Sequence, residues 1–202
     1  GLFDFGGSHA ASTQEPALHN VAAWDVRERL SQEKTALGFF LSGHLFEQGE
    51  AEVRRFAKKR IADLVDSREP VLLAGVVMDL RLVNSQRGRV AIFKLDDMSE
   101  SIESVVGEDL LDKVRDLLRE DELLVVQGKV QPDRFAGGLR LNVQQLWDLP
   151  AARARFGRYL AVAVNGSTPP VADVLRQWPV RRVTTDQGTT TLGLPVRLAI
   201  ER

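Results

Sequence analysis

Residues 71–147 read VLLAGVVMDLRLVNSQRGRVAIFKLDDMSESIESVVGEDLLDKVRDLLREDELLVVQGKVQPDRFAGGLRLNVQQLW, and this stretch decides the fold. It contains five short runs rich in β-branched residues and separated by turn clusters, which is typical of successive strands. The predicted strands are 71–83, 89–96, 101–106, 122–130 and 139–147. Residues 109–118 carry apolar residues at helical spacing, so one helix is predicted between the third and fourth strands.

Five strands with one helix before the fourth follow the order of an OB-fold barrel, which usually binds single-stranded nucleic acid or oligosaccharide. Gly75 allows the bend that a long strand needs when it curves between the two sheets of a small barrel. In the second strand Ala91, Phe93 and Leu95 share one face, and Phe93 is expected in the core. The order of these elements predicts a binding protein rather than a catalyst.

The segments on either side of the barrel complete the predicted organisation. The expected parts are a flexible linker (1–20), a helical segment (21–66) with helices over 24–37 and 47–60, the OB-fold domain (67–150) and a strand–helix–strand tail (151–202). The fold class is therefore α+β, with a small helical N-terminal segment, a five-stranded OB-fold β-barrel and a truncated α/β C-terminal piece. Because the chain opens on Gly1 and its last strand lacks a turn, we expect it to have been cut from a longer chain at both ends.

The composition is that of a folded domain, with 44% hydrophobic and 27% charged residues among 202. No apolar run reaches the length of a membrane span, and no secretory signal is recognisable, so a cytoplasmic location without membrane partners is expected. The absence of cysteine excludes disulfides and thiolate zinc sites. The net charge of −1 provides no overall positive field, so contact with nucleic acid requires a local cluster of Arg and Lys.

The run LGFFLSGHLF (37–46), which follows Gln32, Glu33 and Lys34, resembles a segment of the α subunit of bacterial DNA polymerase III that lies just after the fingers region. The similar pieces that follow are AGVV (74–77), RGRVAIFKLDD (87–97), IESVV (102–106), LLVVQGKV (123–130) and GGLRL (137–141). The resemblance implies a C-terminal region of this polymerase, with a clamp-binding segment, an OB domain and the start of the domain that binds the τ subunit of the clamp loader.

The same resemblance implies what this region lacks. The palm with its catalytic carboxylates would lie upstream, so the parent is a nucleotidyltransferase expected to use Mg²⁺, while this segment carries no catalytic residue and no cofactor. The implied partners are single-stranded DNA, the β sliding clamp and the τ subunit.

Leu2, Phe3 and Phe5 are the predicted clamp contacts. The family carries a peptide of the type Gln-x-x-Leu-Phe before the Gly-His segment, and its aliphatic and aromatic side chains enter a hydrophobic pocket on the clamp. Here Leu2 and Phe3 match the end of that peptide, Phe5 is a possible helper, and the glutamine would precede Gly1. Burying two such side chains contributes roughly 3–6 kcal/mol before ordering costs. The alternative is that Phe3 and Phe5 pack on neighbouring helices.

The residues on or beside the first and last hairpins flank the binding face of an OB fold. The predicted contacts to single-stranded DNA are Arg81, Arg87, Arg89, Lys94, Lys129, Arg134, Phe135 and Arg140. The cations would neutralise phosphates, so binding should weaken as salt rises, and Phe135 is the best residue for base stacking. Glu100, Glu103, Asp96 and Asp97 would repel phosphate if they share that face. Relatives often carry an aromatic residue near Gly107, so weak affinity is expected here.

The remaining polar residues favour structural roles. We interpret His44 as a hydrogen-bonded structural residue and Asp96-Asp97 as a turn that caps backbone donors rather than a two-metal site. No histidine has a second ligand at metal-binding spacing, so no metal site is predicted. Trp147 is expected to seal the bottom of the barrel.

Two alternatives stay open at this stage. The barrel is either a nucleic-acid module or a structural spacer that docks polymerase domains. The near-neutral charge and the few aromatic residues favour the spacer. A third possibility is the anticodon domain of a class II aminoacyl-tRNA synthetase, against which the LGFFLSGHLF segment argues.

Overall fold

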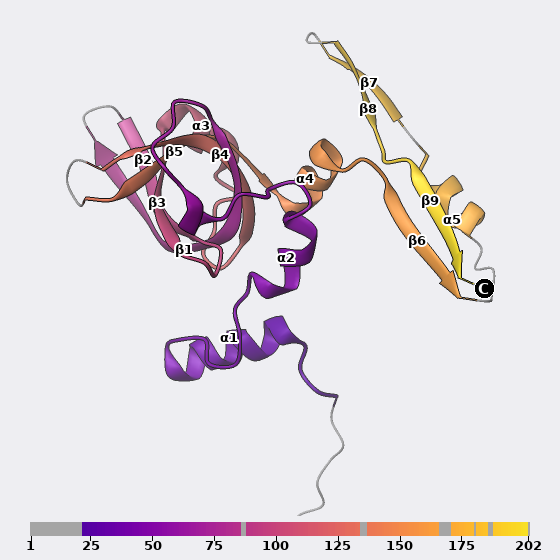
Figure 1. Ribbon diagram of the computed structural model, residues 1–202, viewed down its shortest axis with the longest axis horizontal. Coiled ribbons are helices and arrows are strands. Elements are labelled where there is room, and N and C mark those ends of the chain that lie inside the picture. Colours follow the sequence, from indigo (N-terminus) through magenta and orange to yellow (C-terminus); the bar gives the residue numbers. More distant parts are fainter. Residues whose placement is uncertain are drawn as a thin grey trace, which may run out of the picture. The chain divides into compact units, whose positions relative to one another are not determined.

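The computed structural model describes residues 22–85, 88–133, 137–165, 171–179, 181–185 and 188–201, and the chain divides into two compact units, Gly1–Leu41 and Ser42–Arg202. Five strands of the second unit close into a barrel (Figure 1). This confirms the predicted α+β class with an OB fold. The domain boundaries expected from the sequence stay predictions.

The first unit contains helix α1, Val26–Leu37. Asp25 begins the helix because its side chain accepts a hydrogen bond from the backbone N–H of Glu28 at 2.7 Å. Gly38 ends it at a φ of 84°, where a residue without Cβ is favoured. Both ends lie within two residues of the predicted range.

The barrel strands are β1 (Val71–Ser85), β2 (Gly88–Asp96), β3 (Ser101–Val106), β4 (Leu123–Pro132) and β5 (Leu139–Asp148), and they close in the order β1-β2-β3-β5-β4. All neighbours are antiparallel except β3 and β5, which are parallel. Strand β1 changes partner at Val76, which pairs with Asp96 of β2 and Leu123 of β4. Gly75 lies at this corner, and a Cβ there would stand 2.8 Å from the Asp96 carbonyl oxygen, so the closely approaching strand requires glycine.

Two irregularities add curvature to the barrel. The register of β1 against β2 shifts between Met78 and Arg81, where Asp79 adopts a φ of 54°. The register of β4 against β5 shifts between Gln127 and Gly128. A Cβ on Gly128 would overlap the carbonyl oxygen of Asn142, so no other residue fits that crossing. The sequence did not reveal either shift.

The barrel interior is the main core. Ala91, Phe93 and Leu95 of β2 are buried, which confirms the predicted alternation. Helix α3 (Glu108–Val114) adds Leu111 and Val114 to the same cluster. It is shorter than the predicted 109–118, because the chain continues as turns that still bury Leu118.

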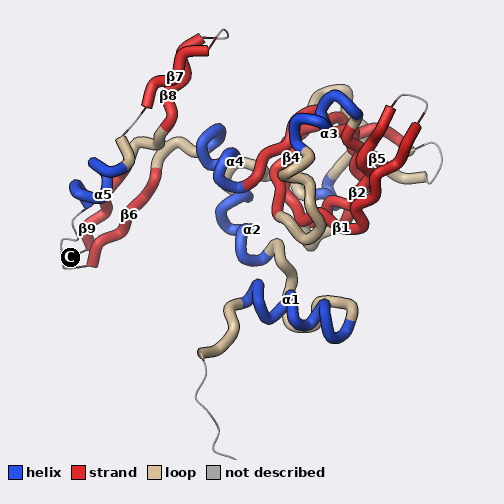
Figure 2. The backbone as a smooth tube through the Cα atoms, turned by 180° about the vertical axis from the view of Figure 1, so that it is seen from behind, coloured by secondary structure: helices blue, strands red, loops and turns tan. Residues whose placement is uncertain are grey.

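A second apolar cluster lies on the outside of the barrel, where strands β1 and β4 face two helices, α2 (Glu47–Val53) and α4 (Leu149–Phe156). The two helices lie side by side in Figures 1 and 2. Phe56 stacks on Phe156 with ring centroids 5.7 Å apart. Arg153 of α4 forms an ion pair with Glu52 of α2, and its hydrogen bonds hold the pKa of Glu52 below its ordinary value.

Two expectations are wrong in this region. Trp147 packs edge-on against Phe156, with centroids 5.2 Å apart, and belongs to the outer cluster rather than sealing the barrel bottom. Helix α2 ends at Val53 instead of continuing to residue 60. The chain turns there because Arg54 donates to the Lys59 carbonyl and the backbone N–H of Ile61 donates to Asp97 of the barrel. These tertiary contacts outweigh helix propensity.

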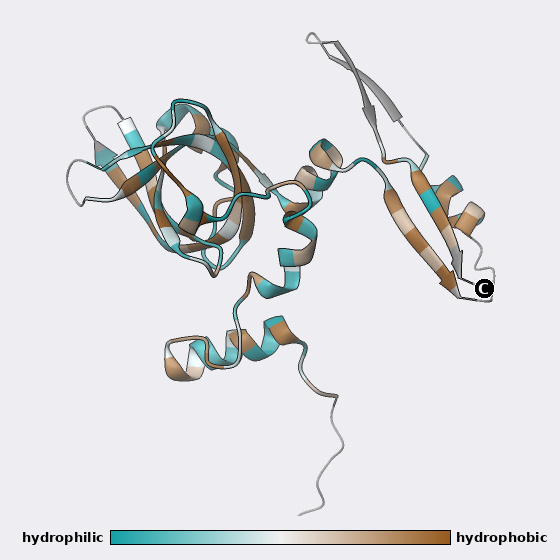
Figure 3. Ribbon diagram, viewed as in Figure 1, coloured by the Kyte–Doolittle hydropathy of each residue, from teal (hydrophilic) through white to brown (hydrophobic). Residues whose placement is uncertain are grey.

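The tail contains β6 (Leu160–Asn165), α5 (Val171–Gln177), β7 (Arg181–Thr185), β8 (Gly188–Leu192) and β9 (Val196–Glu201). Strands β6 and β9 are parallel neighbours, and β6 is hydrophobic along most of its length (Figure 3). The predicted strand–helix–strand order is confirmed, but the β7–β8 hairpin between them was missed. Within the described residues, no helix is long and apolar enough to cross a membrane.

Candidate nucleic-acid interface

One outer surface of the barrel collects four of the predicted cations, Arg81, Lys94, Lys129 and Arg140. In the strand register Lys94 lies opposite Glu103, and Glu103 lies opposite Arg140. Arg81 lies opposite Ile92, which points the same way as Lys94 because alternate residues of a strand share a face. Lys129 lies opposite Asn142, which shares the face of Arg140 for the same reason. We call the surface formed by Arg81, Lys94, Glu103, Lys129 and Arg140 the charged face.

Glu103 is the central anion of the charged face. One of its oxygens accepts a hydrogen bond from Nη2 of Arg140, and the other lies 3.4 Å from Nη2 of Arg81. Arg140 Nη2 also lies 2.9 Å from Asp133, whose side chain is 3% exposed. Glu103 therefore shares the face with the cations, which is the condition under which it is predicted to repel phosphate.

A second ion pair lies beside the first, around a hollow of about 250 Å³. Nζ of Lys94 is 2.8 Å from the carboxylate of Asp79, the residue at the bulge of β1. The residues that line the hollow are Asp79, Arg81, Ile92, Phe93, Lys94 and Glu103. The charged face thus has a hollow beside Arg81, Lys94 and Glu103, and carboxylates neutralise most of its cations.

Lys129 and Arg89 differ from this pattern. Lys129 is half-buried and makes no ion pair or hydrogen bond with its side chain in the described part of the chain. Arg89 has the strand parity of the core residues, so it does not lie on the charged face. It lines a separate hollow of about 470 Å³ beside α3, with Glu108 and Asp112.

Six predicted contacts lie outside the described residues, so their roles stay predictions: Leu2, Phe3, Phe5, Arg87, Arg134 and Phe135. Across the ranges that the structure covers, the barrel strands expose no aromatic ring. Phe93 is 1% exposed, as expected for a core residue, and Trp147 lies against Phe156 and the guanidinium of Arg155. Phe135, the predicted stacking residue, lies outside the described residues, so base stacking on this barrel stays a prediction.

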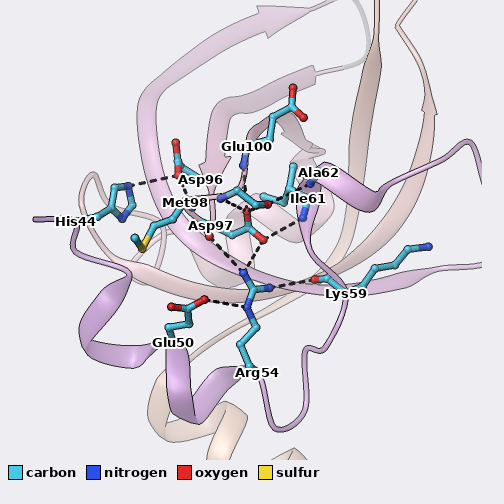
Figure 4. A network of polar contacts seen from close by, with 11 residues as sticks. His44, Glu50, Arg54, Lys59, Ile61, Ala62, Asp96, Asp97, Met98 and Glu100 are labelled. Carbon is cyan, nitrogen blue, oxygen red and sulfur yellow. Dashed lines mark hydrogen bonds and ion pairs between the residues drawn. The ribbon is translucent and has the colours of Figure 1, made fainter.

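Asp97 lies in the β2–β3 turn and is the centre of a buried network of polar contacts, called the junction here (Figure 4). Its side chain accepts hydrogen bonds from Arg54 Nη2 at 2.9 Å, from the backbone N–H of Ile61 at 3.0 Å and from the hydroxyl and backbone of Ser99. Burial by itself raises the pKa of Asp97, but the hydrogen bonds from Ser99, Ile61 and Arg54 together lower it below its ordinary value. This confirms that Asp97 caps backbone donors, and the sequence contained no signal that Arg54 is its partner.

His44 belongs to the same junction, as Figure 4 shows. Its Nδ1 accepts a hydrogen bond from the backbone N–H of Phe46 at 3.0 Å, and its Nε2 lies 3.4 Å from Asp96. The Gly-His segment is thus attached to the β2–β3 turn, in agreement with the structural role predicted for His44. Groups of three or more His, Cys, Asp or Glu side chains that could hold a metal ion do not occur among the described residues.

The chain is similar to several known proteins. A family profile described as an OB-fold nucleic acid binding domain matches residues 71–149. The DNA polymerase III subunit alpha of Neisseria meningitidis serogroup A is 36% identical over 167 residues, which cover 81% of this chain and 14% of that protein. The subunit of the same name from Pseudomonas fluorescens is 38% identical over 151 residues, covering 74% and 13%.

Among solved structures, the second single-stranded DNA binding protein (SSBb) from Mycobacterium smegmatis matches with a TM-score of 0.37 and 11% identity, over 41% of this chain and 90% of that one. The chain spans 13–14% of the length of the curated relatives named above. These relatives share one name, and their matched segments include the barrel and the residues around it. The chain therefore belongs to the DNA polymerase III α subunit family and corresponds to its OB-fold region.

Proposed function

We propose that this chain is the non-catalytic part of a replicative DNA polymerase III α subunit that holds single-stranded template DNA on its OB barrel. The observation that carries the proposal is the gathering of Arg81, Lys94, Lys129 and Arg140 on one outer surface of a barrel related to polymerase subunits. Cations in such a row can follow a phosphate backbone, as OB folds require. Because carboxylates already engage three of the four, affinity is modest. Binding weakens as salt rises, because the contacts to phosphate are electrostatic.

Reversing two of these charges is expected to weaken binding to fluorescein-labelled oligo-dT by at least tenfold at low salt. The double variant Arg81→Glu, Lys129→Glu removes two phosphate contacts and introduces repulsion. The slope of log K against log salt should fall by up to about 1.4, because each neutralised phosphate of a single strand contributes about 0.7. Fluorescence anisotropy at several salt concentrations measures both quantities.

The matched control is Lys113→Glu, Arg115→Glu, which makes the same charge change on exposed residues at the end of α3. It should alter affinity by less than threefold. Equal loss in the two double variants would mean that only net charge matters. No binding by the unmodified chain at millimolar protein would remove the proposal and leave the structural spacer, which the internal ion pairs of the charged face favour.

The second part of the proposal is a tether to the sliding clamp through Leu2, Phe3 and Phe5. Capture of the chain by immobilised clamp should fall at least tenfold in the variant Leu2→Ala, Phe3→Ala, because two apolar anchors leave their pocket. Leu37→Ala, Phe39→Ala is the control, since this leucine and phenylalanine are exposed but lie outside the peptide. Surface plasmon resonance measures capture, and an unchanged signal from the first variant would discard the tether. By the same family likeness, residues 151–202 are proposed as the start of the τ-binding domain.

A further inference from the structure

We propose that Glu103 is an intramolecular competitor for DNA phosphate, and that it limits how tightly the charged face holds a strand. The inference rests on the proposed function and deepens it by naming the residue that limits affinity. The ligand class is the phosphodiester of single-stranded DNA.

The contacts of Glu103 are those that a phosphate would make. Its two oxygens each face one guanidinium, that of Arg140 and that of Arg81. The two non-bridging oxygens of a phosphodiester offer the same pair of acceptors, which is why arginine binds carboxylate and phosphate alike. The Glu103 side chain is 26% exposed, so a strand can reach the position that it occupies.

The pairing of Arg140 leaves its guanidinium incompletely used. Both Glu103 and Asp133 accept from Nη2, whereas Nε is buried and has no hydrogen-bond partner in the described part of the chain. Arginine binds an anion best through two parallel N–H donors. A phosphate group that replaces Glu103 accepts hydrogen bonds from this fork in its place, while Asp133 keeps the side chain in position.

Asp79 also lines the hollow, and it occupies Lys94 as Glu103 occupies the arginines. Its carboxylate lies 2.8 Å from Lys94, and both side chains are more than half exposed. Ion pairs this exposed to solvent are weak, so an incoming phosphate can displace them. Each cation then exchanges a carboxylate for a phosphate, and the net gain in binding free energy is small. Such an exchange suits a template that must keep moving through the site.

Replacing Glu103 with glutamine is expected to tighten binding to labelled oligo-dT about tenfold at low salt. Arg81 and Arg140 would then meet phosphate without a competing charge. The slope of log K against log salt should steepen by about 0.7 for each additional phosphate neutralised. Fluorescence anisotropy on the whole chain measures both effects.

Asp116→Asn is the matched control, because it removes the same charge from an exposed residue beyond α3. It should change affinity by less than twofold. The double variant Arg81→Ala, Glu103→Gln should lose most of the gain, since one of the two released arginines is absent. Equal affinities for Glu103→Gln and Asp116→Asn would overturn the proposal.

Asp79→Asn is the second variant, in case Glu103→Gln does not fold by circular dichroism. Asparagine tolerates the positive φ of this position, so the bulge is retained. It should tighten binding three- to tenfold through Lys94. If neither folded variant exceeds the control while the unmodified chain binds oligo-dT, the inference fails and the proposed function stands. If no variant binds at all, both fail.

Discussion

Replacing Asp97 with alanine is expected to lower the free energy of unfolding of the barrel by about 3–5 kcal/mol, because a buried ion pair loses one partner. The Asp97 side chain has no exposed surface, and that of Arg54 is 18% exposed. Without the carboxylate, Arg54 loses the ion pair at 2.9 Å and keeps a longer one to Glu50, together with hydrogen bonds to backbone carbonyls. The backbone N–H of Ile61 also loses its acceptor. The β2–β3 turn and the segment that follows α2 would both lose their attachment.

Urea denaturation followed by circular dichroism measures this loss, and Asp96→Ala is the matched control. Asp96 is the adjacent aspartate, but its side chain is 25% exposed, and within the described residues its polar partners are His44 and the Met98 backbone. Its removal should cost about 1 kcal/mol. Similar losses in the two variants would show that the junction described around Asp97 does not hold the turn.

The effect of Asp97 should also depend on pH in a defined direction. Its pKa is lowered on folding, so its contribution to stability is present above the pKa of the unfolded aspartate, about 3.9. The contribution is lost as the pH falls from there through the lower folded pKa. The stability difference between the unmodified chain and Asp97→Ala should therefore be constant near neutral pH and shrink below about pH 4. A difference that grows on acidification would contradict the assigned shift.

Replacing Phe93 with alanine is expected to cost about 3–5 kcal/mol, the range for a fully buried aromatic residue whose removal leaves a cavity. Phe93 is 1% exposed and belongs to the interior cluster of the barrel. Thermal unfolding followed by circular dichroism should show a lowered midpoint with the secondary structure retained at low temperature.

Ile92→Ala is the comparison for this prediction, since Ile92 is the neighbour on the outer face and is half-buried. It should cost less than half as much, because fewer apolar groups leave a packed environment. A larger cost for Ile92 than for Phe93 would invert the assignment of the two faces of β2.

Much of the barrel could be predicted because its strands combine alternation with recognisable turns. The third strand was placed at its observed bounds, and the others within a few residues. Helix α1 was predictable for the same kind of reason, since Asp25 and Gly38 are local capping signals. Helix α2 was predicted too long, because nothing local marks Val53 as its end. That end depends on the contact between Arg54 and Asp97, which are 43 positions apart.

The candidate site was predictable only in part. Alternation within one strand separates Lys94 from Phe93, but it does not say which strands are neighbours. The parallel pairing of β3 with β5 brings Glu103 opposite Arg140, 37 positions away, and the bulge of β1 brings Asp79 to Lys94. The sequence groups Arg89 with Lys94 because the two are close along the chain. Arg89 is an odd number of residues from Lys94 in β2, so the two side chains lie on opposite faces.

The sequence by itself determined the order of the barrel elements, the inward face of β2 and the membership in a polymerase family, because these depend on local periodicity and on motifs. The tertiary structure alone decided which charges meet. Barrel closure, one parallel strand pair and a bulge place Glu103 between two arginines and bury Asp97 beneath Arg54. Charge pairing depends on distance in space, and neighbours across a closed sheet can be far apart in the chain.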